Sequence, residues 1–210
     1  MIKLKLQKFS VFSASKKGIG ELKSEIIRKA IHFLIAFSPL MAAVNRQFTL
    51  FFLMAGVCCY TLMEYLRLSG TKVPVISSIT RMASRPGDAG SFIMGPVTLG
   101  LGAFLALFLF PPQTAAIAIY ALAFGDGFAS LVGKFSGNWR PAILCGKSVE
   151  GSIACFTAVF ISAYAVSNSV RISAIAAFTA MVVEAMPLDD YDNLAVPVTV
   201  GLIVQLALFQ

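Results

Sequence analysis

The chain has 210 residues, enough for one domain; 58% of them are hydrophobic and 13% are charged. With a mean hydropathy of +0.82, this composition places the chain in the membrane class rather than among water-soluble domains. The four cysteines, Cys58, Cys59, Cys145 and Cys155, form no CxxC pair and have no His-rich partner stretch, which argues against structural zinc.

Residues 1–24 form a basic arm in which Ile2, Leu4 and Leu6 alternate with lysines. The pattern is typical of a segment that lies on an anionic leaflet, and a frayed tail is the alternative. The arm lacks the apolar core and the small-residue cleavage site of a signal peptide, so we expect none to be removed. Residues 25–210 are expected to form a single transmembrane domain.

Seven apolar stretches follow, each close to the roughly 20 residues that a helix needs to cross a bilayer. The sixth is short and the fifth contains several Ser and Thr, so six spans is the alternative to seven. No strand alternation or internal repeat is visible, and we predict an all-α transmembrane bundle with a short interfacial helix between the second and third spans. The predicted spans are 26–45, 48–66, 90–110, 113–133, 150–168, 171–187 and 193–209.

The charges are distributed unevenly between the loops. Of the 17 basic residues, all but Arg46 and Arg171 fall in the N-terminal region or in the loops on the same predicted side. This bias predicts a cytoplasmic N-terminus. It also explains the net charge of +7 without nucleic acid, which we do not expect as a partner. We predict an integral protein of a bacterial inner membrane, with its polar loops facing the cytoplasm.

All ten acidic residues lie on that same side, many at the ends of apolar runs. A carboxylate beside hydrocarbon is costly, which marks it as a functional candidate. We expect Asp126, Glu150, Glu184 and Asp192 to converge in a polar cavity facing the cytoplasm, where they would hold Mg²⁺ and, through it, phosphate groups. Lys134, Arg140 and Lys147 are the lysines and arginine expected to neutralise them.

Two short motifs flank one predicted cytoplasmic loop. In the first, Gly125 and Gly127 remove side chains around Asp126, which allows a ligand to approach; a helix kink is the alternative. In the second, Lys147 and Ser148 precede the next helix, with Ser148 as the expected N-cap, and a helix N-terminus beside a lysine favours phosphate. Gly146-Lys147-Ser148 is not a Walker A loop, because position 141 is Pro.

Together these motifs resemble the signature of the dolichol kinase and phytol kinase family, GDxxAxxxGK…GKSxEG. The N-terminal RKxxH element of that family resembles Arg28-Lys29-Ala30-Ile31-His32, and its ExxR element resembles Glu64-Tyr65-Leu66-Arg67. Its C-terminal element resembles Glu184 with Asp192-Asn193 and Pro197, so the likeness extends over residues 28–197. The main signature is carried by Gly125, Asp126, Ala129, Gly133, Lys134, Gly146, Lys147, Ser148, Glu150 and Gly151.

The resemblance implies a kinase that transfers the terminal phosphate of CTP to a lipid alcohol, with a divalent cation such as Mg²⁺ as cofactor. It implies a nucleotide and metal site that includes Asp126, Lys147, Ser148, Glu150 and Asp192-Asn193. His32 and Asp126 are the rival candidates for the base that activates the lipid hydroxyl. For Arg28, Lys29 and Arg67 the alternative is that they are ordinary positive charges at the cytoplasmic ends of helices.

Two other functions remain open from the sequence. The same motifs more remotely resemble phosphatidate cytidylyltransferase, which would make a CDP-lipid. A small ion-coupled transporter would also carry carboxylates in its membrane helices, although here they gather at one face rather than at the midplane. The sequence leaves open which alcohol is used, whether CTP, ATP or UTP is the donor, and the oligomeric state.

Overall fold

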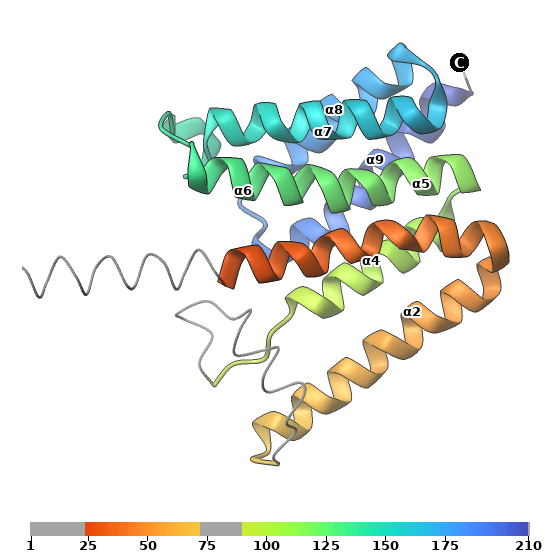
Figure 1. Cartoon of the computed structure of the whole chain (residues 1–210), viewed down its shortest axis with the longest axis vertical. Coiled ribbons are helices and arrows are strands. Elements are labelled where there is room, and N and C mark those ends of the chain that lie inside the picture. The colour runs from red at the N-terminus through yellow and green to blue at the C-terminus, as the bar shows by residue number, and fades with distance from the viewer. Residues whose placement is uncertain (1–23, 72–89, 210) are drawn as a thin grey trace, which may run out of the picture.

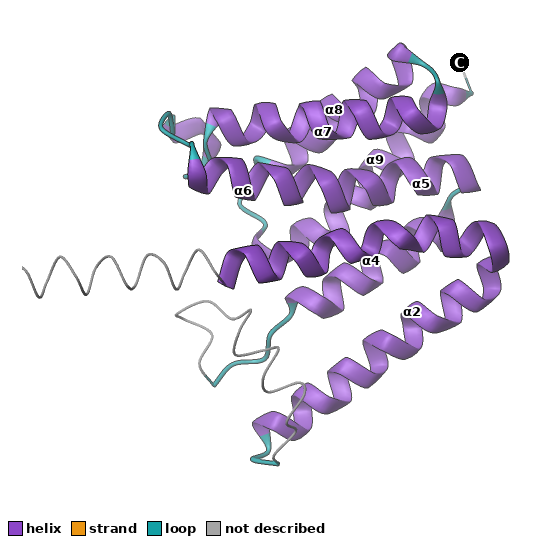
Figure 2. Cartoon of the chain, in the orientation of Figure 1, coloured by secondary structure: helices purple, strands orange, loops and turns teal. Residues whose placement is uncertain are grey.

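The computed structural model describes residues 24–71 and 90–209. Every regular element in these two ranges is a helix, which confirms the predicted all-α class (Figure 2). The basic arm before Ser24 and the interfacial helix expected between the second and third spans lie outside the described residues. The division into an arm and one domain therefore stays a prediction.

The first helical stretch is bent back on itself. It starts at Ser24, passes through the short helix η1 (Ile35–Phe37) and continues as α2 (Ser38–Leu68). At Asn45 the backbone is extended, with φ −154° and ψ 103°, and the chain reverses there (Figure 1). Asn45 Oδ1 accepts a hydrogen bond from the Phe48 backbone nitrogen at 2.9 Å, which caps the returning helix. We call residues 24–44 the first arm of this bend and residues 46–68 its second arm. Both names are distinct from the basic arm at the N-terminus.

Six further helices and short turns complete the described chain. Prolines at the starts of α4 and α5 supply the φ angle of a first helical turn without losing a needed N–H. α5, the π-helical turn η2 and α6 form one continuous rod (Figure 1). The elements are α4 (Gly95–Leu109), α5 (Pro112–Tyr120), η2 (Ala121–Asp126), α6 (Gly127–Phe135), η3 (Ala142–Leu144), α7 (Val149–Ser167), α8 (Val170–Glu184), η4 (Asp189–Tyr191) and α9 (Asp192–Leu208).

Within the described ranges, four helical stretches are long and apolar enough to cross a membrane, judged by length and composition. They are Ser24–Leu68, Pro112–Phe135, Val149–Ser167 and Asp189–Leu208. α4 and α8 have 15 residues each, which at about 1.5 Å per residue is shorter than the roughly 30 Å hydrocarbon layer. The helices are compatible with an integral membrane protein, and the count of seven spans stays a prediction.

Small side chains allow the helices to pack closely. α8 buries Ala176, Ala177 and Ala180 completely, and it packs against α7 and α9. Gly201 of α9 lies against the Phe110 ring so closely that a Cβ there would come within 2.2 Å of the ring. In a membrane such close contacts hold helices together, because lipid removes most of the hydrophobic driving force between them.

Candidate active site

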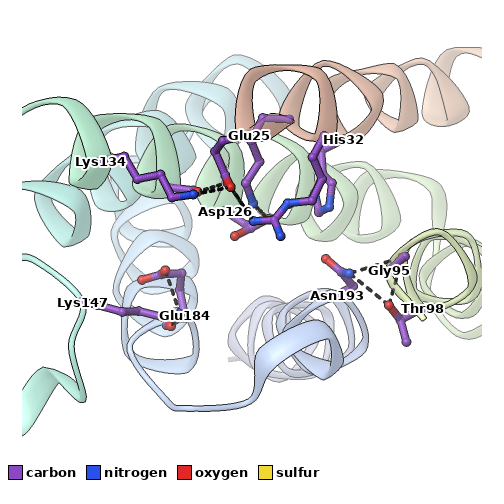
Figure 3. A network of polar contacts seen from close by, with 12 residues as sticks. Glu25, His32, Gly95, Thr98, Asp126, Lys134, Lys147, Glu184 and Asn193 are labelled. Carbon is purple, nitrogen blue, oxygen red and sulfur yellow. Dashed lines mark hydrogen bonds and ion pairs between the residues drawn. The ribbon is translucent and has the colours of Figure 1, made fainter. Parts of the chain in front are cut away.

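One cavity of about 340 Å³ lies at the end of the bundle that carries the loop between α6 and α7. Both arms, α4, α6, α7 and the segment from the end of α8 to the start of α9 contribute to its lining. Figure 3 shows its polar residues facing a common space. The predicted site residues that line it are Arg28, His32, Asp126, Ala129, Gly133, Lys134, Gly146, Lys147, Ser148, Gly151, Glu184, Asp192 and Asn193.

Asp126 lies at the centre of this arrangement and is almost fully buried. It is the last residue of the π-helical turn η2, where one extra residue in the turn locally widens the helix. The ammonium of Lys29 donates to its Oδ2 atom, and Nδ1 of His32 lies 3.1 Å from the same oxygen. Lys29 and His32 are therefore brought to Asp126 by the first arm. The Gly125-Asp126-Gly127 motif thus coincides with the end of a π-helical turn, and the approach of a ligand to Asp126 stays a prediction.

A second buried carboxylate, Glu25, ties the first arm to α6. It accepts hydrogen bonds from Arg28 at 2.7 Å, from Lys134 at 2.6 Å and from the Ser130 hydroxyl. Lys134, predicted to contact the nucleotide, is thus engaged with Glu25, although its side chain stays half exposed. Sequence reasoning missed Glu25, because a carboxylate among the lysines and arginines at the start of a span looks like an ordinary surface charge.

Lys147 and Ser148 lie where α7 begins. Ser148 Oγ accepts a hydrogen bond from the Gly151 backbone nitrogen at 3.1 Å, which confirms Ser148 as the predicted N-cap. Lys147 pairs with the Glu184 carboxylate at 2.8 Å and also donates to the Glu184 backbone carbonyl. About a third of the Lys147 side chain stays exposed, so this ammonium faces both Glu184 and the cavity.

The start of α9 is fixed against α4. The Asn193 side-chain nitrogen donates to Thr98 Oγ1 at 3.0 Å and to the Gly95 carbonyl at 3.5 Å. Pro197 has no N–H, so the Asn193 carbonyl lacks its usual hydrogen-bond partner within α9. Because Gly102 has no side chain, α4 can approach that carbonyl closely. Figure 3 shows the Asn193 amide nitrogen directed toward Gly95 and Thr98. Its Oδ1 atom is buried and has no hydrogen-bond partner among the described residues.

The glycines of the signature serve the packing of α6 on α7. A Cβ on Gly151 would meet the Ala129 carbonyl at 2.7 Å, and one on Gly133 would meet Ser148 Oγ at 3.1 Å. Gly125 does not line the cavity; its missing side chain makes room for Val159 and Cys155 of α7. These residues therefore position Asp126 and Ser148 relative to each other.

Glu150 and Arg140 stabilise the loop between α6 and α7. Glu150 Oε1 accepts hydrogen bonds from the backbone nitrogens of Asn138 and Trp139 at 3.0 and 3.2 Å. Arg140 donates to the carbonyls of Gly133 and Gly146. Glu150 does not line the cavity, so the structure brings together Asp126, Glu184 and Asp192 but not the fourth predicted carboxylate.

Glu64 and Arg67 also lie outside the cavity lining and form a clamp behind one of its walls. Glu64 is fully buried at the end of the second arm. It accepts two hydrogen bonds from Arg67 at 2.8 Å and one from the Ile93 backbone nitrogen at 3.1 Å. Arg67 in turn donates to the Ser91 carbonyl. The pair attaches the second arm to the segment that leads into α4.

Oxygen atoms suited to a divalent cation occur in the cavity, but they are spread out. In the described part of the chain no three His, Cys, Asp or Glu side chains are grouped as a metal site. Asp126 and Asp192 line the same cavity and are close enough to act on each other electrostatically. The unpartnered Asn193 oxygen is on the same lining. The same lining also carries Glu184, Asp189 and Asp190.

Comparison with known proteins finds no family whose pattern matches the chain, no similar curated protein and no similar solved structure. Any functional assignment therefore rests on the geometry of the cavity together with the sequence motifs.

Proposed function

We propose that this protein is a membrane kinase that transfers the terminal phosphate of a nucleoside triphosphate, CTP by the sequence resemblance, to the hydroxyl of a lipid alcohol. By the charge bias of the loops, the reaction takes place at the cytoplasmic face of a bacterial inner membrane. One observation carries the proposal: a single cavity joins the buried Lys29–Asp126–His32 cluster to Lys147 at the start of α7. The cavity thus combines groups that could activate a lipid hydroxyl with groups that could bind phosphate.

The phosphate end of the cavity is the start of α7. The first turn of a helix presents backbone N–H groups without helical partners, and its dipole favours negative charge. Lys147 stands one residue before the N-cap and adds a full positive charge. Its present partner, Glu184, is on the cavity lining too, so Lys147 can exchange a carboxylate for a phosphate without crossing apolar material.

Carboxylate and amide oxygens on the lining are the ligand types that a magnesium ion takes at a nucleotide site. Mg²⁺ in such sites is held by one or two carboxylates together with substrate phosphates, so a cluster of three acidic side chains is not needed. Asp126, Asp192 and the Asn193 amide oxygen would be its ligands. When bound, the ion would neutralise charge on the triphosphate.

His32 is the better placed of the two candidate bases. Asp126 pairs with the Lys29 ammonium and would also be a ligand of the magnesium ion, and both positive charges oppose its taking up a proton. The lipid hydroxyl oxygen would bond to the terminal phosphorus as the bond to the nucleoside diphosphate breaks, and the hydroxyl proton would pass to Nε2 of His32. The Asp126 carboxylate, 3.1 Å from Nδ1, would then stabilise the positive ring through its charge.

The test is a product analysis with purified protein, CTP, Mg²⁺ and a panel of lipid alcohols and phosphatidate. A kinase releases CDP and forms a lipid phosphate. Release of pyrophosphate with a CDP-lipid would instead assign the cytidylyltransferase reaction. Release of neither product under conditions where the protein is folded would contradict the proposal and leave transport as the remaining class.

A further inference from the structure

The cavity has two chemically different walls. Lysine and arginine residues of the lining gather where α6, the following loop and α7 meet, and most of its carboxylates lie between the end of α8 and the start of α9. A second, largely apolar wall is formed by Ile31 of the first arm, Tyr60 of the second arm, Ile93 just before α4, and Leu99 of α4. The two arms diverge from their turn at Asn45 (Figure 1), and this second wall draws residues from both.

The cavity is too small to enclose both substrates completely. Its volume of about 340 Å³ is near the lower limit of ligand pockets, which run from about 300 to 1,000 Å³. A nucleoside triphosphate alone would fill most of this space. The hydrocarbon tail of a long-chain alcohol must therefore stay outside the cavity, and only its hydroxyl end can reach His32.

The apolar wall is held in a fixed position. The Tyr60 hydroxyl donates to the Ile93 carbonyl at 3.2 Å, and Glu64 accepts from the Ile93 nitrogen. Both backbone groups of Ile93 are thus anchored to the second arm, while its side chain lines the cavity. The size of that side chain then determines how wide a tail can pass.

We propose, building on the proposed kinase function, that the alcohol approaches from the bilayer between the two arms and that its tail leaves the cavity over Ile31, Tyr60, Ile93 and Leu99. Ile93 and Leu99 are specificity-determining residues in this arrangement. The substrate class is a long-chain alcohol whose tail remains in the bilayer during phosphate transfer, and no water-exposed channel has to hold it.

Two variants with opposite effects test the proposal. Ile93→Trp narrows the wall and leaves the backbone hydrogen bonds of residue 93 available. We expect it to lower kcat/KM for a long isoprenoid alcohol by about tenfold or more, the scale of apolar pocket discrimination, and to change kcat/KM little for prenol, which has one isoprene unit. Leu99→Ala widens the wall and should favour bulkier tails. The matched control is Met94→Trp, which adds the same bulk beside Ile93 at a residue outside the lining.

Equal losses with long and short alcohols, or equal losses in Met94→Trp and Ile93→Trp, would overturn the proposal. A second measurement does not depend on activity. A photoreactive long-chain alcohol with a diazirine in its tail is crosslinked to wild-type protein in bilayers, and the labelled peptides are identified. Labelling of the second arm around Tyr60 and of the segment around Ile93 that leads into α4 is expected, and labelling confined to other parts of the chain would contradict it. If labelling occurs there but no phosphate is transferred, the proposed function fails and the tail site stands.

Discussion

The ammonium of Lys29 pairs with the carboxylate of Asp126 across 97 residues of sequence, and both side chains are almost fully buried. Each charge makes the other tolerable in an apolar bundle, since either alone would carry a large desolvation cost. The pair also attaches the first arm to the rod of α5, η2 and α6.

The pair predicts a stability effect that can be separated from catalysis. Lys29→Met should lower the free energy of unfolding by about 3–5 kcal/mol, because it leaves the Asp126 charge buried and unpaired. Asp126→Asn should also destabilise the protein, since Lys29 then loses its partner. Denaturant unfolding in detergent measures both.

The double variant Lys29→Met/Asp126→Asn provides the control. It should recover much of the lost stability, because no buried charge is left unpaired, and it should remain inactive. Recovery of phosphate transfer in the double variant would show that Asp126 has only a structural role.

The acidic residues are expected to separate into two groups. Glu150→Gln should retain most of the activity, because a Gln oxygen can still accept the backbone hydrogen bonds of Asn138 and Trp139. Asp192→Asn should lose activity at ordinary Mg²⁺ concentrations, since an amide is a weaker ligand for a hard cation. Activity titrated against Mg²⁺ compares the two variants, and the reverse ranking would place the metal at Glu150.

Lys147→Ala should impair the use of nucleotide more than the use of lipid. Loss of one charge-assisted contact to phosphate costs about 1.5–3 kcal/mol, which is about tenfold to 150-fold in kcat/KM for CTP. The control is Lys134→Ala, because Lys134 is engaged by Glu25 and should mainly affect stability. Steady-state kinetics with each substrate varied in turn separates the effect on nucleotide use from the effect on lipid use. An unchanged KM and kcat for CTP would remove Lys147 from the nucleotide site.

Gly102→Ala should displace the start of α9. A Cβ there would come within 2.0 Å of the Asn193 carbonyl, and both partners belong to packed helices, so one helix has to move. We expect a clear loss of activity together with a lower Tm. The matched control is Gly56→Ala in the second arm, where a Cβ meets nothing within 4 Å and helix propensity favours Ala. If both variants behaved alike, the close contact at Gly102 would not be what positions Asn193.

The sequence predicts the helices better than it predicts the contacts between them. Apolar runs bounded by Asn45, Pro112 and Ser148 locate helix ends, because a cap or a proline acts within one turn. The presence of Asp126 and Lys147 at one cavity follows from motifs and charge bias. The pairing of Lys29 with Asp126 does not, because it depends on how the first arm crosses α6, which no local pattern encodes.

Two residues show why other details were out of reach. Glu150 and Asp126 look alike in sequence, each a carboxylate beside glycines near a helix end. Only the path of the loop between α6 and α7 turns Glu150 toward the backbone of Asn138 and Trp139. Glu25 is the opposite case: in the sequence it looks like a surface charge, but in the structure it is buried against Ser130 and Lys134, two residues of the cavity lining.

The most direct test of the proposed reaction follows the label of two forms of CTP, one labelled at the terminal phosphorus and one at the phosphorus next to the ribose. Wild-type protein in bilayers that contain a long-chain alcohol and Mg²⁺ should transfer label to lipid from the first form and not from the second, and Asp126→Asn should transfer neither. Lipid labelled from the second form, or no labelled lipid from either form with folded wild-type protein, would contradict the assignment of this cavity to phosphate transfer.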